Sequence, residues 1–136
     1  MDLAISTSNE NPVFYVQYAH ARICSIYRQA EEQGVALLPL SEVDLTVLNT
    51  EHEYDLLRKI GELPEEIATA AAGYAPHRMI RYVYDLASLF HSYYKAQRVI
   101  TEDAAQTQAR FALLGAVRTV IANVLRIVGV SAPEKM

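Results

Sequence analysis

The segment from Asn11 to Ser25 constrains the fold more than any other part of this 136-residue chain, because it has the features of a long helix. Pro12 suits the first turn of a helix, where its missing N–H would have no partner, and Asn11 suits the N-cap before it. Apolar residues then recur at helical spacing and predict a face turned toward a core: Val16, Ala19, Ile23, Ile26 and Ala30. With Gly34 as the stop, the pattern predicts a helix over residues 12–33.

The rest of the chain also follows a helical period, and no stretch alternates strictly between polar and apolar residues as a strand would. Long helices are predicted over residues 77–97, after Pro76, and from a cap at Thr101 to a stop at Gly129. Shorter helices are predicted over residues 42–48, 51–62 and 64–72, which begin at Ser41, Thr50 and Pro64. The sequence therefore predicts an all-α, antiparallel bundle of about three long and two or three short helices. Its C-terminal tail could fold back toward the first helix.

Composition indicates where in the cell the chain is expected and whether it contains a disulfide or a membrane span. A single cysteine, Cys24, excludes an internal disulfide, and its position within a helix favours a small buried hydrophobe over a reactive thiol. No apolar run is long enough to cross a membrane, and the first residues lack the basic start and long apolar centre of a signal peptide. A cytoplasmic location without a membrane partner is expected.

The net charge of −4 is unevenly distributed along the chain. Residues 1–28 carry two basic and two acidic side chains, residues 29–76 carry two and ten, and residues 77–136 carry eight and four. Attraction to phosphate is local, because salt screens it within about 10 Å, so the two end segments could still contact RNA. The alternative is that each arginine only solvates a helix face.

The residue types needed for catalysis or metal binding do not cluster in the sequence. There is no glycine-rich phosphate loop, and the four histidines do not pair. His20 and Cys24, four residues apart, can share a helix face, but a zinc site needs about four ligands and no second pair is present. No catalytic residue and no metal site are predicted.

Three side chains on the first helix suggest binding chemistry. Tyr15, Tyr18 and Arg22 are spaced at i, i+3 and i+7, on the flank beside the apolar face. The core needs neither two phenol rings nor a guanidinium at this place. These groups are suited to stacking on bases and to contacting phosphate.

The segment NPVFYVQYAHARICS, residues 11–25, resembles the start of the helical anticodon-binding (DALR-type) domain of arginyl-tRNA synthetases. Later segments resemble the rest of that domain in order and spacing, namely residues 82–87, 91–94, 98–100, 110–114, 128–130 and 133–136. The resemblance implies the class I synthetase anticodon-binding fold for residues 11–136 and a connector from a catalytic domain for residues 1–10. It also implies that ATP and arginine bind that catalytic domain, so this part of an arginine–tRNA ligase should be inactive by itself.

The resemblance carries roles for four residues. Tyr15 and Tyr18 would pack on unstacked anticodon bases, and Arg22 would contact a phosphate or a base edge. Met136, with its terminal carboxylate, would close the pocket. The expected partners are an arginine-accepting tRNA and the chain's own catalytic domain, and DNA is not expected.

Two other functions remain open from the sequence. The acidic segment over residues 42–66 would suit a helical protein–protein interaction module that binds no RNA. The anticodon domain of a related synthetase is the second alternative. The run from Gln17 to Arg22 favours the arginine enzyme over it.

Overall fold

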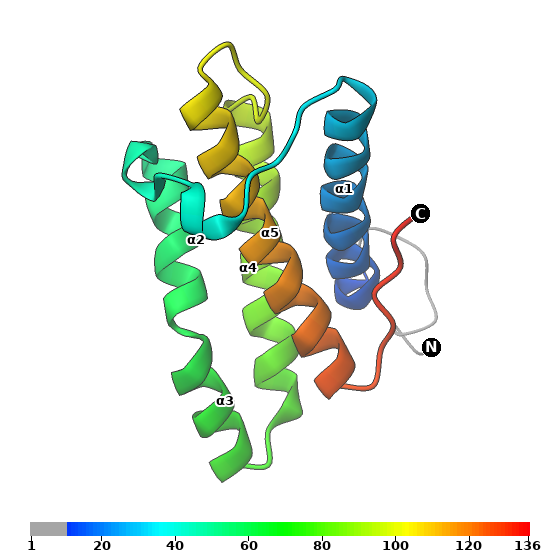
Figure 1. Cartoon of the computed structure of the whole chain (residues 1–136). Helices are drawn as coiled ribbons and strands as arrows, with labels where there is room; N and C mark the ends of the chain where they lie inside the picture. Colours follow the sequence, from blue (N-terminus) through cyan, green and yellow to red (C-terminus); the bar gives the residue numbers. More distant parts are fainter. Residues whose placement is uncertain (1–10) are drawn as a thin grey trace.

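The computed structural model describes residues 11–136, and this part of the chain is helical without any strand (Figure 1). Its five α-helices are α1 (Pro12–Glu32), α2 (Glu51–Gly61), α3 (Leu63–Ala72), α4 (Pro76–Ala96) and α5 (Ala104–Ile127). Successive long elements run in opposite directions, with α2 and α3 following one another along the same side (Figure 1). The predicted all-α antiparallel bundle is confirmed. The connector expected over residues 1–10 lies outside the described residues.

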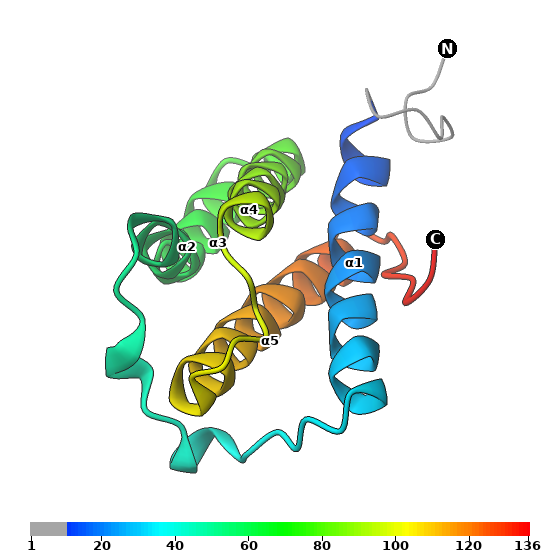
Figure 2. The same ribbon diagram turned by 90° about the horizontal axis from the view of Figure 1, so that it is seen from above.

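Helices α4 and α5 form the centre of the bundle. Helix α4 packs against all four other helices, and α5 packs against α1, α2 and α4. Figure 2 shows α1 on one side of this pair, and α2 with α3 on the other. The surfaces of α1 and of α2–α3 are therefore separated by the core.

The buried face of α1 is the predicted one, and its five apolar residues are at most 4% exposed. Helical spacing predicts an apolar face on α4 that consists of Ile80, Val83, Leu86, Ala87, Phe90 and Tyr94. Four of these are buried and Ile80 is partly buried, but Tyr94 is also only partly buried. The buried face of α4 is turned slightly from the prediction, so Tyr93 lies in the core in its place. The Tyr93 hydroxyl can be buried because it donates a hydrogen bond to Glu53 Oε2 at 2.8 Å.

Local capping chemistry explains where the helices begin. Asn11 Oδ1 accepts the N–H groups of Val13 at 2.9 Å and Phe14 at 3.3 Å, at the first turn that Pro12 occupies. Thr50 and Glu53 form a capping box at the start of α2, in which each side chain accepts the other residue's N–H. These two predicted helix starts are confirmed.

The short helix predicted over residues 42–48 is wrong. The structure has two separate 3₁₀ turns there, Leu40–Glu42 and Leu45–Val47, and neither contains a buried residue. A continuous helix is stabilised mainly by burying one face, whereas this connection places only Leu48, at 3% exposure, into the core. Short 3₁₀ turns are typical of such connections.

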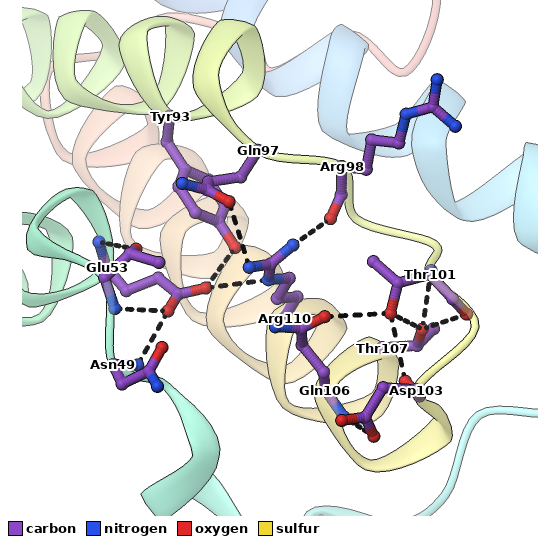
Figure 3. Close-up of polar contacts among 11 residues, drawn as sticks. Asn49, Glu53, Tyr93, Gln97, Arg98, Thr101, Asp103, Gln106, Thr107 and Arg110 are labelled. Atoms are coloured by element: carbon purple, nitrogen blue, oxygen red, sulfur yellow. Dashed lines mark hydrogen bonds and ion pairs between the residues drawn. The ribbon is translucent and has the colours of Figure 1, made fainter.

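The cap predicted at Thr101 is also wrong. Asp103 is the N-cap of α5, and its side chain accepts the N–H of Gln106 at 3.2 Å. Thr101 lies two residues earlier, where its N–H donates to Thr107 Oγ1 at 2.9 Å (Figure 3). Both residues are common caps, so the three-dimensional course of the loop decides between them.

A buried ion pair connects α2 to α5. Arg110 Nε lies 2.9 Å from Glu53 Oε2, and the two side chains are 4% and 1% exposed. The guanidinium also donates from Nη1 to the carbonyl of Arg98 and from Nη2 to Gln97 Oε1, so each of its three nitrogens makes a hydrogen bond (Figure 3). Burial alone would raise the pKa of Glu53. Hydrogen bonds from Thr50, Tyr93 and Asn49, together with the charge of Arg110, lower the pKa below its ordinary value.

Replacing Arg110 by methionine should destabilise the fold strongly, because the Glu53 carboxylate would stay buried without its ion partner. Breaking a buried pair in this way costs about 3–5 kcal/mol of unfolding free energy. The exposed pair of Arg58 and Asp55, at 3.1 Å, supplies the control, and Arg58→Met should cost at most about 1 kcal/mol. Urea denaturation measures both.

The pH dependence provides a second check on the pair. The pKa of Glu53 is lowered on folding, so its stabilising contribution is present above the unfolded value near 4.5 and is lost as the pH falls below that value. Arg110→Met should flatten this acid-side decline. A variant as stable as the Arg58→Met control, with an unchanged acid decline, would contradict a stabilising role for the buried pair.

Candidate nucleic-acid interface

A hollow of about 400 Å³ lies where α1, α4 and the C-terminal tail meet. Tyr18, Arg22 and Met136, three of the four predicted site residues, line it together with Tyr94 of α4. Tyr18 and Met136 are 41% and 53% exposed, so a ligand can reach them from solvent. The hollow thus brings together residues of α1 and of the chain end, which are more than a hundred positions apart in the sequence.

The guanidinium of Arg22 lies between two aromatic rings. Its Cζ is 4.4 Å from the ring centroid of Tyr94 and 5.7 Å from that of Tyr18, both within the range of cation–π attraction. Among the ion pairs of the described residues none involves Arg22, although its neighbours orient it. Its charge is therefore held in place without being neutralised by a carboxylate.

His91 contacts the same guanidinium. Arg22 Nη1 lies 3.3 Å from His91 Nδ1. Because a guanidinium has only donors, Nδ1 must be the acceptor, and the ring proton is on Nε2. Burial, followed by the charges of Arg22 and Lys95, lowers the pKa of His91 to about 4. The imidazole is therefore neutral at physiological pH, as this hydrogen bond requires.

Tyr15, the fourth predicted residue, does not line the hollow. Its half-buried ring lies 4.7 Å from the ring of Tyr84 and 5.1 Å from that of His91. His91 is also 5.8 Å from the ring of Tyr18, so the imidazole contacts both tyrosines. The structure places Tyr15 beside the hollow, and its contact with a base stays a prediction.

Two residues of this region were missed by sequence reasoning as site residues. Helical spacing predicts Tyr94 in the core of α4, and the family resemblance of residues 91–94 gives His91 no role. Both lie on the edge of the α4 buried face, which Phe90 and Tyr93 already occupy. Tyr93 and Tyr94 are neighbours in the sequence, and neighbouring residues of a helix cannot both point to the centre of its buried face. This pair is the signal that could have identified Tyr94.

The C-terminal tail folds back along α1, as predicted (Figures 1 and 2). Gln17 Nε2 donates to the carbonyl of Ser131 at 2.9 Å, and His20 Nδ1 lies 2.9 Å from the carbonyl of Pro133. Arg28 Nη1 donates to the carbonyl of Glu134 at 3.3 Å. These contacts precede Lys135 and Met136, which complete the wall of the hollow.

Other chemistry has little support in the described part of the chain. No group of three or more histidine, cysteine or acidic residues within residues 11–136 could hold a metal ion. His20 and Cys24 do approach each other, with Sγ 3.9 Å from Nδ1, but His20 already bonds the tail. None of the helices described here is long and apolar enough to cross a membrane.

Comparison with known proteins shows the family of the chain. The family model of the DALR anticodon binding domain matches residues 16–136. The chain belongs to this family. Arginine–tRNA ligases of Desulforamulus reducens and Caldanaerobacter subterraneus subsp. tengcongensis are 55% and 56% identical to it over 136 residues. These alignments include the whole chain and 24% of each relative, so this DALR domain spans about a quarter of the length of those proteins.

The fold is also similar to a solved structure of this enzyme class. The arginyl-tRNA synthetase of Thermus thermophilus superposes with a TM-score of 0.80 at 30% identity. The match covers 98% of this chain and 22% of that one. The predicted family and fold are thereby confirmed.

Replacing His91 by phenylalanine should change how the stability of this DALR domain depends on pH. The folded pKa of about 4 lies below the ordinary value of 6.5, so the unfolded chain takes up this proton first. The unfolding free energy of the wild type should therefore decline as the pH falls from 6.5 toward 4, by about 1–3 kcal/mol from this group. The variant lacks that contribution.

The measurement is urea denaturation of both proteins at pH 7.5, 6, 5 and 4. The other histidines and Glu53 are present in both proteins, so the difference between the two curves isolates His91. A difference that stays constant across the series would show that His91 titrates normally in the fold and would contradict its neutral role.

Proposed function

We propose that this chain is the anticodon-recognising domain of an arginine–tRNA ligase and that the hollow at α1, α4 and the tail receives the anticodon loop of an arginine-accepting tRNA. The observation that carries the proposal is the meeting of Tyr18, Arg22 and Met136 in one solvent-open hollow. The named relatives, which share the whole chain at about 55% identity, support the choice of tRNA.

Each wall of the hollow has a role in the proposed recognition. Tyr18 stacks on an unstacked loop base, as aromatic side chains do in single-stranded RNA recognition. Arg22, already oriented by Tyr94 and His91, donates to a phosphate or a base edge. Met136 packs against the base from the tail side. Tyr15 stacks on a neighbouring base.

The charge distribution favours RNA at this surface over the acidic protein–protein alternative. Arg22, Arg28 and Lys135 surround the hollow. Most acidic side chains of residues 29–76 belong to α2, α3 and the connection before them. Figure 2 places α2 and α3 across the central helices from α1. Phosphate therefore approaches the positive side of the domain.

The expected strength of binding is modest for this domain alone. Base–aromatic stacking contributes about 1–3 kcal/mol per base. One or two stacked bases and one guanidinium give a weak, salt-sensitive complex. In the proposed ligase, ATP and arginine bind a catalytic domain outside this chain, which supplies further tRNA contacts and without which the chain does not charge tRNA. The proposed location is the cytoplasm.

Titration of the 136-residue chain with a fluorescent anticodon stem-loop of an arginine-accepting tRNA tests the proposal. At low salt, binding should saturate and should weaken when the salt concentration rises, because phosphate contacts release counterions. A stem-loop with the same stem and substituted anticodon bases is the matched control and should bind more weakly. No binding of either RNA would favour the protein–protein alternative, and equal binding of both would contradict recognition of the anticodon bases.

Tyr18→Ala and Arg22→Ala should weaken stem-loop binding while the domain stays folded. Loss of one stacked base at about 1–3 kcal/mol corresponds to roughly 5- to 150-fold for Tyr18→Ala. If Arg22 contacts phosphate, Arg22→Ala should also lower the slope of log affinity against log salt by about 1.

Exposed residues on α2 provide matched controls for these two variants. Tyr54 is 50% exposed, and Arg58 forms an ion pair with Asp55 on the surface. Tyr54→Ala and Arg58→Ala should leave the affinity within twofold of the wild type. If the α1 and α2 variants behaved alike, the hollow would not be the RNA site.

A further inference from the structure

We infer that Gln17, His20 and Arg28 form a clamp on α1 that holds the C-terminal tail and thereby positions Met136 in the hollow. We call these three residues the tail clamp. The effect on RNA binding rests on the proposed function, whereas the positioning of the tail does not. Gln17 and His20 do not line the hollow, so they are positioning residues that act through the tail.

The reversal of the chain after α5 directs the tail toward the clamp. Gly129 has a φ of 81°, and the N–H of Val130 donates to the carbonyl of Leu125 at 2.8 Å. The N–H of Gly129 donates to the carbonyl of Arg126 at 3.1 Å. This is a Schellman-type end, in which the left-handed glycine turns the chain away from the helix axis.

The tail clamp then holds the returning chain by its main chain. Its residues are spaced three and eight positions apart, which places them along one side of α1 at about 100° per residue. Each bonds a carbonyl oxygen of the tail, in the order Ser131, Pro133 and Glu134. Because all three acceptors belong to the backbone, the clamp fixes the path of the tail independently of its side chains.

His20 is the central member of the tail clamp. It is 6% exposed, and since a carbonyl can only accept, Nδ1 carries the proton that bonds Pro133. A lost bond at this buried position would leave both groups unsatisfied, which costs more than the net value of an exposed hydrogen bond. Gln17 and Arg28 are only partly buried, so water can replace their bonds more easily.

Apolar packing does not hold the tail by itself. No residue from Gly129 to Met136 is fully buried, although Val130 and Ala132 pack partly against the core. Met136 lies three residues beyond Pro133, and an extended chain spans at most about 3.6 Å per residue. Fixing Pro133 therefore confines Met136 to within roughly 11 Å of that point, which limits how far it can move from the hollow.

The test replaces His20 by leucine, which fills the space without a donor, and by asparagine, whose amide N–H₂ lies close to the position of Nδ1. Methyl NMR of ¹³C-labelled methionine reports the tail at Met136 and the core at Met79, which is 3% exposed. A Met136→Leu variant assigns the tail signal. His20→Leu should move the Met136 signal to the position of a free peptide and leave Met79 unchanged, whereas His20→Asn should keep both.

The outcomes separate the tail clamp from the proposed RNA site. A Met136 signal that stays in place in His20→Leu, with Met79 intact, would overturn the clamp without any RNA measurement. If the Met79 signal also moves, His20→Leu disturbs the core, and Gln17→Ala is used in its place. A partial shift of the Met136 signal toward the free position is then expected. No shift in that case would overturn the clamp as well.

Stem-loop affinity provides the second measurement. His20→Leu should lower the affinity by the same factor, within twofold, as removal of Met136, and combining the two changes should produce no further loss. A larger, additive loss in the combined variant would contradict action through the tail. If the Met136 signal moves but the affinity is unchanged, the tail clamp stands, and the role of Met136 in the proposed function is refuted.

Discussion

Helix α1 has to serve the core and the surface at once, and the rest of the candidate site depends on how it does so. A residue advances about 100° on a helix, so side chains three or four positions apart form separate lengthwise faces. The apolar face, from Val16 to Ala30, is buried against α4 and α5. Tyr18 and Arg22 occupy one flank of it, and the tail clamp occupies the other. The hollow lies between these flanks, so packing of the apolar face alone determines where both are presented.

The buried pair of Glu53 and Arg110 attaches α2 to the core, on the opposite side of the central helices. Helix α2 is short and buries few residues, chiefly Glu53 and Leu56. A buried ion pair is a weak source of net stability compared with apolar packing, but breaking it is costly. The carboxylate also caps α2 and accepts the Tyr93 hydroxyl, so one side chain links α2, α4 and α5. This link fixes α2, with its acidic side chains, on the side of the domain away from the hollow.

The elements that could be predicted from the sequence are those whose signals are local. Asn11 and Pro12 specify the start of α1, and Leu63 and Pro64 separate α2 from α3, because caps and prolines act on their own turn. Pairings between distant elements leave no such signal. Glu53 and Arg110 are 57 residues apart, and nothing in either segment indicates that the two side chains meet. Thr101 and Asp103 are equally good local caps, so only the loop path could choose Asp103.

The candidate site also contains residues that local sequence signals predict and residues that they do not. The positions of Tyr18 and Arg22 follow from helical spacing, and the return of Met136 follows from short connections and the family resemblance. His91 was not predictable, because its importance arises from its contacts with the rings of two tyrosines and with a guanidinium. An imidazolium there would repel Arg22, whereas the neutral ring accepts its hydrogen bond. The apolar surroundings that keep His91 neutral therefore also keep the charge of Arg22 available for a phosphate or a base, which joins the packing of α4 to the chemistry of the hollow.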